Sequence, residues 1–203
     1  MFSRPSPRTA RPRSPARSNA QRTETTRTAL LDAAHALFID RGYAATGTPE
    51  ICATAGVTRG ALYHHFADKR ALFVAVLERE ARAVRDAIEA AAPAAGSTNQ
   101  ALRAGAEAYL AAMAERGRTR LLLIDGPAVL GPEAEAIDNA HAGAALRDGL
   151  KAVLRRDAAF TSALASLLSA AFDRAARDQA LSDATAARKA MRWLLDRVVE
   201  TKD

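Results

Sequence analysis

Apolar residues recur along most of this chain at the spacing of one helix face. Between residues 25 and 41 they stand at i, i+1, i+4, i+7 and i+8, the pattern of an amphipathic helix, which Gly42 ends. The same pattern predicts a long helix over 68–91, capped by Asp68, and no segment shows the alternation of a strand. Further helical patterns and one short apolar segment follow at 97–116, 118–124, 132–155, 159–177 and 183–200. The pattern therefore predicts an all-α fold.

Two very short helices fill the interval between the first helix and the long one. Thr48 is suited to cap the first of them, with Pro49 at its first helical position, where a missing N–H costs nothing. Gly56 can adopt the positive φ of a helix stop, and Thr58 can cap a second helix over 59–64. Two helices joined by so short a turn form a helix-turn-helix, whose second helix can enter a DNA major groove. With these two, about nine helices are expected.

The positive charge of the chain is concentrated at its N-terminus. Of the 203 residues, 29 are basic and 23 acidic, but residues 1–23 contain six arginines and no acid, so the remainder is neutral. Residues 1–22 are also rich in Pro and Ser without apolar periodicity, which predicts a disordered basic arm able to contact nucleic acid. We expect a helix-turn-helix DNA-binding domain over 23–70 and a second helical domain over 71–203.

The composition excludes several classes of protein and site. A single cysteine, Cys52, rules out a disulfide framework or a cysteine-rich metal site and is consistent with a reducing, cytoplasmic location. No apolar run reaches the roughly 18 residues of a membrane span. The sequence lacks a Gly-x-Ser-x-Gly elbow, a phosphate-binding loop and a dinucleotide fingerprint, so we expect no enzyme, no catalytic residue and no cofactor. His35 and His141 have no ligands beside them at metal spacing, so no metal is expected.

Residues 25–72 resemble the DNA-binding unit of the TetR family of bacterial transcriptional regulators. The match in order and spacing is carried by Ala33-Ala34, Leu37-Phe38, Gly42-Tyr43, Thr46, Ile51, Ala55-Gly56-Val57-Thr58, Gly60, Leu62-Tyr63, His65-Phe66 and Lys69. A further segment, 122–131, resembles one found in a subgroup of such regulators. The first match covers roughly a quarter of the chain, and its combination of residues is specific.

This resemblance implies an all-helical homodimer that binds a double-stranded DNA operator. Three N-terminal helices would bind the DNA, and about six more would enclose a pocket for a small-molecule effector, the last two forming a four-helix bundle across the dimer. Three positions depart from the family pattern. Gly47 removes a side chain that could contact DNA, Cys52 replaces a usual Ala, and Arg70 replaces a usual Glu and is suited to a phosphate contact.

Seven residues of this unit are candidates for contact with DNA. Arg59, the only long cation on the second short helix, could read guanine through O6 and N7 or contact a phosphate instead. Gly60 would permit close approach of another helix or of DNA. The others match phosphate-contacting positions or place a hydroxyl at a helix N-terminus: Thr48, Thr58, Tyr63, His64 and Lys69. Capping and packing remain the alternative roles for these side chains.

Five residues of the second domain are candidates to face an effector. A mostly apolar cavity with a few polar groups would suit a small hydrophobic molecule. The candidates are Tyr109, Met113, His141, Phe172 and Asp173. Filling the core is the alternative role for each of them.

These observations favour a DNA-binding transcriptional regulator, a repressor released from a palindromic operator by a small, largely hydrophobic ligand. Two other classes stay open at this point: a helical carrier or enzyme without a regulatory role, and a protein that binds DNA without sequence preference. The missing catalytic motifs weigh against an enzyme, and the neutral charge of residues 24–203 weighs against binding without preference. The sequence does not specify the ligand, the operator or the sign of regulation.

Overall fold

The computed structural model describes residues 19–92, 96–181 and 184–200, and within them it is all-α, as predicted. The elements in chain order are α1 (Asn19–Ala45), α2 (Thr48–Ala55), α3 (Arg59–His65), α4 (Lys69–Ala91), α5 (Thr98–Met113), α6 (Arg118–Arg120), the π-helical η1 (Leu121–Asp125), α7 (Gly126–Leu130), α8 (Pro132–Ala140), α9 (Ala142–Val153), α10 (Ala158–Leu181) and α11 (Ala184–Glu200). The expected six helices after the helix-turn-helix correspond to α4 and α5, the α6–α7 run, the α8–α9 pair, α10 and α11.

The first helix begins earlier than its apolar pattern predicted. It starts at Asn19, so residues 19–22, expected to belong to a disordered arm, form its first turn; the rest of that arm lies outside the described residues. Gly42 interrupts the helix, as predicted, with a φ of 81° that a side chain would strain. One further helical turn then leads to Ala45.

The segment expected over 118–124 does not end there, because the helical run continues through Asp125-Gly126-Pro127 to Leu130. Gly126 has helical dihedrals, φ −56° and ψ −60°, and Pro127 stands in the first turn of α7, where its missing N–H costs nothing. A Cβ at Gly126 would come within 3.2 Å of Leu77 of α4, so the glycine serves close packing of α7 on α4. The run from α6 to α7 ends instead at Gly131, where φ is 58°.

The single helix expected over 132–155 is also wrong, because the chain bends at His141. This residue has φ −118° and ψ −93°, which ends α8 and begins α9 in a new direction. The bend allows both helices to contact α4 while α9 also packs against α5 and α10.

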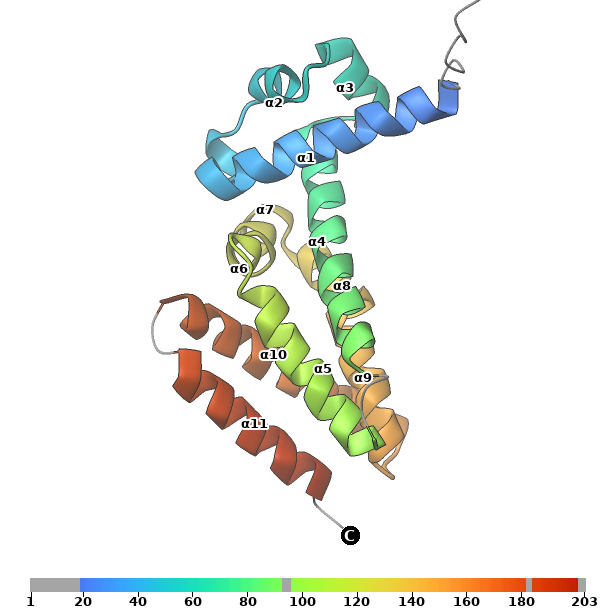
Figure 1. Cartoon of the computed structure of the whole chain (residues 1–203), viewed down its shortest axis with the longest axis vertical. Helices are drawn as coiled ribbons and strands as arrows, with labels where there is room; N and C mark the ends of the chain where they lie inside the picture. Colours follow the sequence, from blue (N-terminus) through green and yellow to red (C-terminus); the bar gives the residue numbers. More distant parts are fainter. Residues whose placement is uncertain (1–18, 93–95, 182–183, 201–203) are drawn as a thin grey trace, which may run out of the picture.

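Two hydrophobic cores lie along the molecule, and α4 contributes to both. The upper core holds α1, α2, α3 and the start of α4, including Leu72 and Phe73, together with Leu121 and Leu130. The lower core joins Val84 of α4 to α5, α9, α10 and α11. Figure 1 shows α4 descending from the head formed by α1–α3 into the body below. The long helix therefore connects the helix-turn-helix to the rest of the chain, and the upper core extends past the expected domain boundary at 70.

Candidate nucleic-acid interface and effector cavity

The helix-turn-helix is held by local capping, with one difference from the prediction. Gly47, not Thr48, occupies the N-cap position of α2, and no side chain caps that end. Gly56 has a φ of 66° and ends α2, and the hydroxyl of Thr58 accepts a hydrogen bond from the Ala61 N–H at 3.2 Å, as predicted. Thr48 cannot act as a cap because it is already the first helical residue, which frees its hydroxyl for another partner.

The buried side of the helix-turn-helix faces α1 and α4, which leaves its outer side open. Ile51 and Leu62 are fully buried, and Cys52 and Phe66 are 5% exposed. Cys52 is thus a small buried residue with a free thiol. In Figure 1, α2 and α3 form one end of the molecule, so the outer side of α3 is accessible to a long ligand such as a DNA duplex.

Three of the predicted DNA-contacting residues form a cluster on this outer side. The hydroxyls of Thr48 in α2 and Tyr63 in α3 lie 3.5 Å apart, and the Arg59 guanidinium lies 5.9 Å from the Tyr63 ring centroid. Hydrogen bonding with Thr48, and secondarily with Arg59, lowers the pKa of the Tyr63 hydroxyl. Tyr63 is nevertheless 46% exposed, so its ring and hydroxyl remain available to a phosphate or sugar.

Gly60 and His64 also lie on the exposed surface of α3. A Cβ placed on Gly60 would meet nothing nearer than the Thr58 hydroxyl at 3.9 Å. No other helix of the described chain therefore requires a glycine here. The His64 ring stands edge-on to that of His65, with centroids 5.4 Å apart, and burial lowers the pKa of His65.

The two basic residues that open α4 are bound within the protein. The Lys69 ammonium donates to the backbone carbonyls of Tyr43 and Thr46, both at 3.0 Å, and lies 4.1 Å from the Tyr43 ring centroid. Lys69 thus ties α4 to the end of α1, and a phosphate contact would use its third N–H. Arg70, expected to be suited to a phosphate, instead forms an ion pair with Glu133 of α8.

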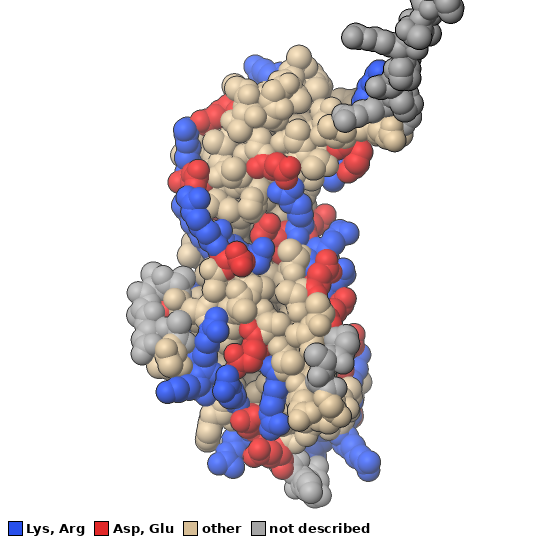
Figure 2. Space-filling model, in the orientation of Figure 1, with Lys and Arg blue, Asp and Glu red and all other residues tan. Residues whose placement is uncertain are grey.

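On the face seen in Figure 2, few charged side chains cover α2 and α3. Figure 2 shows mostly uncharged side chains over the end formed by α2 and α3, with basic and acidic side chains interspersed along the body below. This agrees with the charge count, which leaves residues 24–203 neutral. Binding of DNA by this face would therefore depend on a few placed groups, and on the arginines of residues 1–18, which lie outside the described residues.

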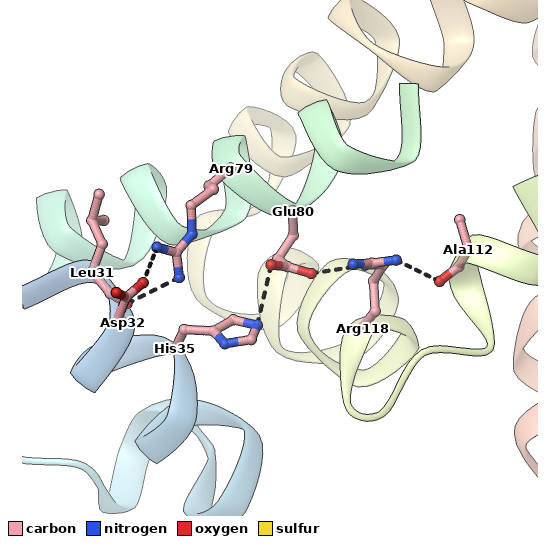
Figure 3. A network of polar contacts seen from close by, with 7 residues as sticks. All are labelled: Leu31, Asp32, His35, Arg79, Glu80, Ala112 and Arg118. Atoms are coloured by element: carbon pink, nitrogen blue, oxygen red, sulfur yellow. Dashed lines mark hydrogen bonds and ion pairs between the residues drawn. The ribbon is translucent and has the colours of Figure 1, made fainter. Parts of the chain in front are cut away.

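A buried ionic network attaches the head to the body (Figure 3). The Glu80 carboxylate of α4 accepts from His35 of α1 at 3.1 Å and from Arg118 of α6 at 2.7 Å, while Arg118 also donates to the Ala112 carbonyl at 2.7 Å. Burial raises the pKa of Glu80, but these two donors and their charges outweigh it and lower the pKa to about 2. His35 is thus a hydrogen-bonded residue, and Glu80 links all three elements.

A cavity of about 310 Å³ lies between α4, α5, α9 and α10. Its walls are mainly apolar, from Ile88, Leu102, Ala106, Leu146 and Phe172. This volume is within the range of small-molecule sites, which are typically mostly apolar with a few placed polar groups.

Two of the five predicted pocket residues line this cavity. They are Tyr109 and Phe172, whose rings meet edge-to-face with centroids 5.6 Å apart. Asp173 stands behind them and accepts a hydrogen bond from the Tyr109 hydroxyl at 2.6 Å. Met113 is buried and borders a separate cavity, and His141 at the α8–α9 bend lies outside the lining.

Sequence reasoning missed three polar residues. Two of them, Ser169 and Asp138, lie near this cavity, and the third, Glu80, is the centre of the ionic network. Ser169 lines the cavity, and its hydroxyl lies 3.5 Å from the carboxylate of Asp138 in α8. Glu80 stands four residues after Val76 and three after Leu77, so a charge on the apolar stripe of the long helix was the available signal. Asp138, four residues after the buried Ala134, carried a weaker signal of the same kind.

Two family models match this chain. The model described as "Bacterial regulatory proteins, tetR family" matches residues 30–76, and the one described as "Tetracyclin repressor-like, C-terminal domain" matches residues 99–201. Together they cover the helix-turn-helix and most of the body.

The chain is also similar to individual transcriptional regulators. A crystal structure of a TetR-family transcriptional regulator from Pectobacterium atrosepticum has a TM-score of 0.72 and 30% identity, covering 92% of this chain and 100% of that one. The chain is 33% identical over 120 residues to the transcriptional activator FasR of Mycolicibacterium smegmatis, covering 59% of this chain and 55% of that protein. It is 46% identical over 63 residues to the transcriptional regulator AcrR of Shigella flexneri, covering 31% of this chain and 29% of that protein. It thus spans about half, or less, of these two curated relatives.

In residues 19–92, 96–181 and 184–200, no helix combines the length and the apolar character needed to cross a bilayer.

Proposed function

The chain belongs to the TetR family of bacterial regulatory proteins, and we propose on this basis that it is a dimeric, ligand-responsive, DNA-binding repressor in the cytoplasm. The observation that carries the proposal is the cluster of Thr48, Arg59 and Tyr63 on the open side of a helix-turn-helix whose opposite side is buried. Membership of a family of regulators also confirms that the chain is not an enzyme.

Arg59 is the side chain best placed to read bases. A bidentate contact from an arginine to guanine contributes about 1–3 kcal/mol of discrimination against other bases. We expect Arg59→Ala to reduce affinity for a palindrome selected from random DNA by that amount, and to change affinity for unrelated DNA far less. Arg155→Ala is the matched control, because Arg155 is an exposed arginine at the far end of α9. An equal loss on both DNAs would refute base reading by Arg59.

A second copy of the chain would bring two α3 helices to successive major grooves, about 34 Å apart. The exposed apolar side chains of α10 and α11 support dimerisation: Leu167 is 71% exposed and Trp193 60% exposed. Large apolar side chains left in water are typical of an interface. We expect Leu167→Lys to convert a dimer to a monomer in sedimentation velocity, whereas Lys151→Ala, at an exposed charged position of α9, leaves it a dimer.

The arginines of residues 1–18 would add affinity that does not depend on sequence. Each phosphate that a cation neutralises steepens the salt dependence of binding. Removal of residues 1–18 is expected to lower affinity and to flatten the plot of log affinity against log salt. An unchanged slope would show that these arginines do not contact DNA.

The cavity in the body would hold the effector and control release. A ligand releases the operator only if it binds the DNA-incompetent conformation more tightly than the competent one. Repression predicts that a reporter behind the selected palindrome is silenced by the protein and restored by the effector. Increased expression would refute repression while leaving DNA binding intact.

A further inference from the structure

The charged residues that line the effector cavity are all acidic. In the described part of the chain these are Glu89 of α4 and Asp148 of α9, both exposed at the rim, and no lysine or arginine belongs to the lining. The interior is apolar apart from Tyr109 and Ser169. An anionic head group entering this cavity would therefore meet no basic side chain in its walls.

Two further carboxylates stand behind the polar end of the cavity. Asp173 accepts from the Tyr109 hydroxyl at 2.6 Å, and Asp138 lies 3.5 Å from the Ser169 hydroxyl. Neither forms an ion pair with a described residue. Arg177 of α10 donates to the backbone carbonyl of Asp173 at 3.3 Å, and its charge partly offsets that of the Asp173 carboxylate.

Burial affects how these two carboxylates titrate. Burial, reinforced by the charge of Asp173, raises the pKa of Asp138 to about 6, and burial also raises the pKa of Asp173 against the hydrogen bond from Tyr109. Asp138 is therefore mostly ionised at neutral pH, but its negative charge lacks a counter-ion. A cation placed near Ser169 and Tyr109 would supply one, whereas an anion would add like charge in a poorly screened site.

We propose that the cavity selects an apolar molecule that carries a protonated amine and rejects carboxylates of the same shape. The amine lies at the Tyr109–Ser169 end, where it can also face the aromatic rings of Tyr109 and Phe172, and the apolar body lies against Ile88, Leu102 and Leu146. The inference rests on the proposed function, because it names the class of the effector that acts through this cavity.

A matched set of probes tests the charge preference directly. Decylammonium, decanol and decanoate share a ten-carbon chain and differ in the charge of the head group. Their affinities for the full-length wild-type chain are measured by isothermal titration calorimetry at pH 7.5, below micellar concentrations. We expect decylammonium to bind at least tenfold more tightly than decanoate, with decanol between them.

Two variants locate the source of the preference. Asp138→Asn and Asp173→Asn each remove one charge and keep a carbonyl that can accept from Ser169 or Tyr109. Each should reduce the ratio of decylammonium to decanoate affinity at least threefold and leave decanol binding unchanged, which also shows that the cavity is intact. Glu78→Gln is the control, since it removes the same charge from an exposed position on α4 and should not alter the ratio.

The outcomes separate the inference from the function on which it rests. Equal or tighter binding of decanoate, or no binding of any of the three probes, overturns the inference. DNA binding is measured on the same preparation. A chain that binds a discrete palindrome but prefers decanoate refutes the charge preference alone. A chain that prefers decylammonium but binds no discrete DNA site supports the preference and refutes the regulatory function.

Discussion

Replacing Glu80 by Gln tests the network that joins head to body. The substitution keeps the size of the side chain but removes the charge that accepts hydrogen bonds from His35 and Arg118. Glu80 is 7% exposed, so water cannot readily replace these partners. The variant leaves the Arg118 guanidinium, 16% exposed, with a weaker acceptor and the Ala112 carbonyl.

The magnitude follows from the lowered pKa of Glu80. A shift from the ordinary 4.5 to about 2 corresponds to about 3 kcal/mol of stability at neutral pH, since one unit is about 1.4 kcal/mol. That agrees with the cost of about 3–5 kcal/mol for breaking a buried ion pair. For a chain of this length we expect the melting temperature to fall by about 6–12 °C.

The pH dependence has a defined sign. Because the folded-state pKa of Glu80 lies below the unfolded value, its contribution is fully present above pH 4.5 and is lost as the pH falls from 4.5 towards 2. The difference in unfolding free energy between wild type and Glu80→Gln should therefore shrink as the pH falls from 4.5 towards 2.

Urea denaturation followed by circular dichroism at several pH values measures this difference. Glu78→Gln is the matched control, an exposed glutamate on the same helix, and should change stability by less than about 0.5 kcal/mol. A difference below about 1 kcal/mol for Glu80→Gln at pH 7 would refute the reasoning, because a buried carboxylate that accepts hydrogen bonds from Arg118 and His35 could not be so weakly coupled. A difference that did not change between pH 5 and 3 would refute the assignment to this carboxylate.

Three substitutions test other parts of the molecule. Gly60→Ala should stabilise the fold by up to about 1 kcal/mol, since α3 has space for a methyl group, yet weaken operator binding in a gel-shift titration; unchanged binding would exclude close approach to DNA here. Gly117→Ala should destabilise by about 1–3 kcal/mol in urea denaturation, because φ is 80° and the new Cβ would lie 2.6 Å from the Ile39 side chain; a neutral result would contradict that packing. Tyr109→Phe should cost about 1–3 kcal/mol by leaving the Asp173 carboxylate without its donor, whereas Tyr63→Phe, at an exposed hydroxyl, should be neutral in the same assay.

Local sequence was sufficient wherever a residue acts on its own neighbourhood. The stops at Gly42 and Gly56 were predicted because a positive φ is a property of glycine itself. The caps Thr58 and Asp68 bond to N–H groups three residues away, so their spacing was visible in the chain. Thr48 was misassigned because capping and first-helical positions differ by one residue, which composition does not resolve.

Tertiary contacts determined the roles that sequence reasoning missed. Arg70 was expected to be suited to a phosphate, because sequence spacing does not reveal its acidic partner. That partner, Glu133, lies 63 residues further along the chain, on α8, which packs against α4. The helical run continues past residue 124 because Gly126 adopts helical dihedrals. Its lack of a side chain also leaves room for Leu77 of α4. The acidic residues that line the cavity belong to α4 and α9, and those behind it belong to α8 and α10. No regular sequence spacing relates them.

The sequence by itself determined the all-α class, the helix-turn-helix and the zero net charge of residues 24–203, because periodicity, capping and charge are properties of adjacent residues. Only the tertiary structure decided that Glu80 joins His35 to Arg118, that Lys69 supports the end of α1, and which side chains face the cavity. Helical periodicity specifies which face of a helix turns inward. The partners that this face meets depend on where the helices cross, and that is set by the packing of the whole chain.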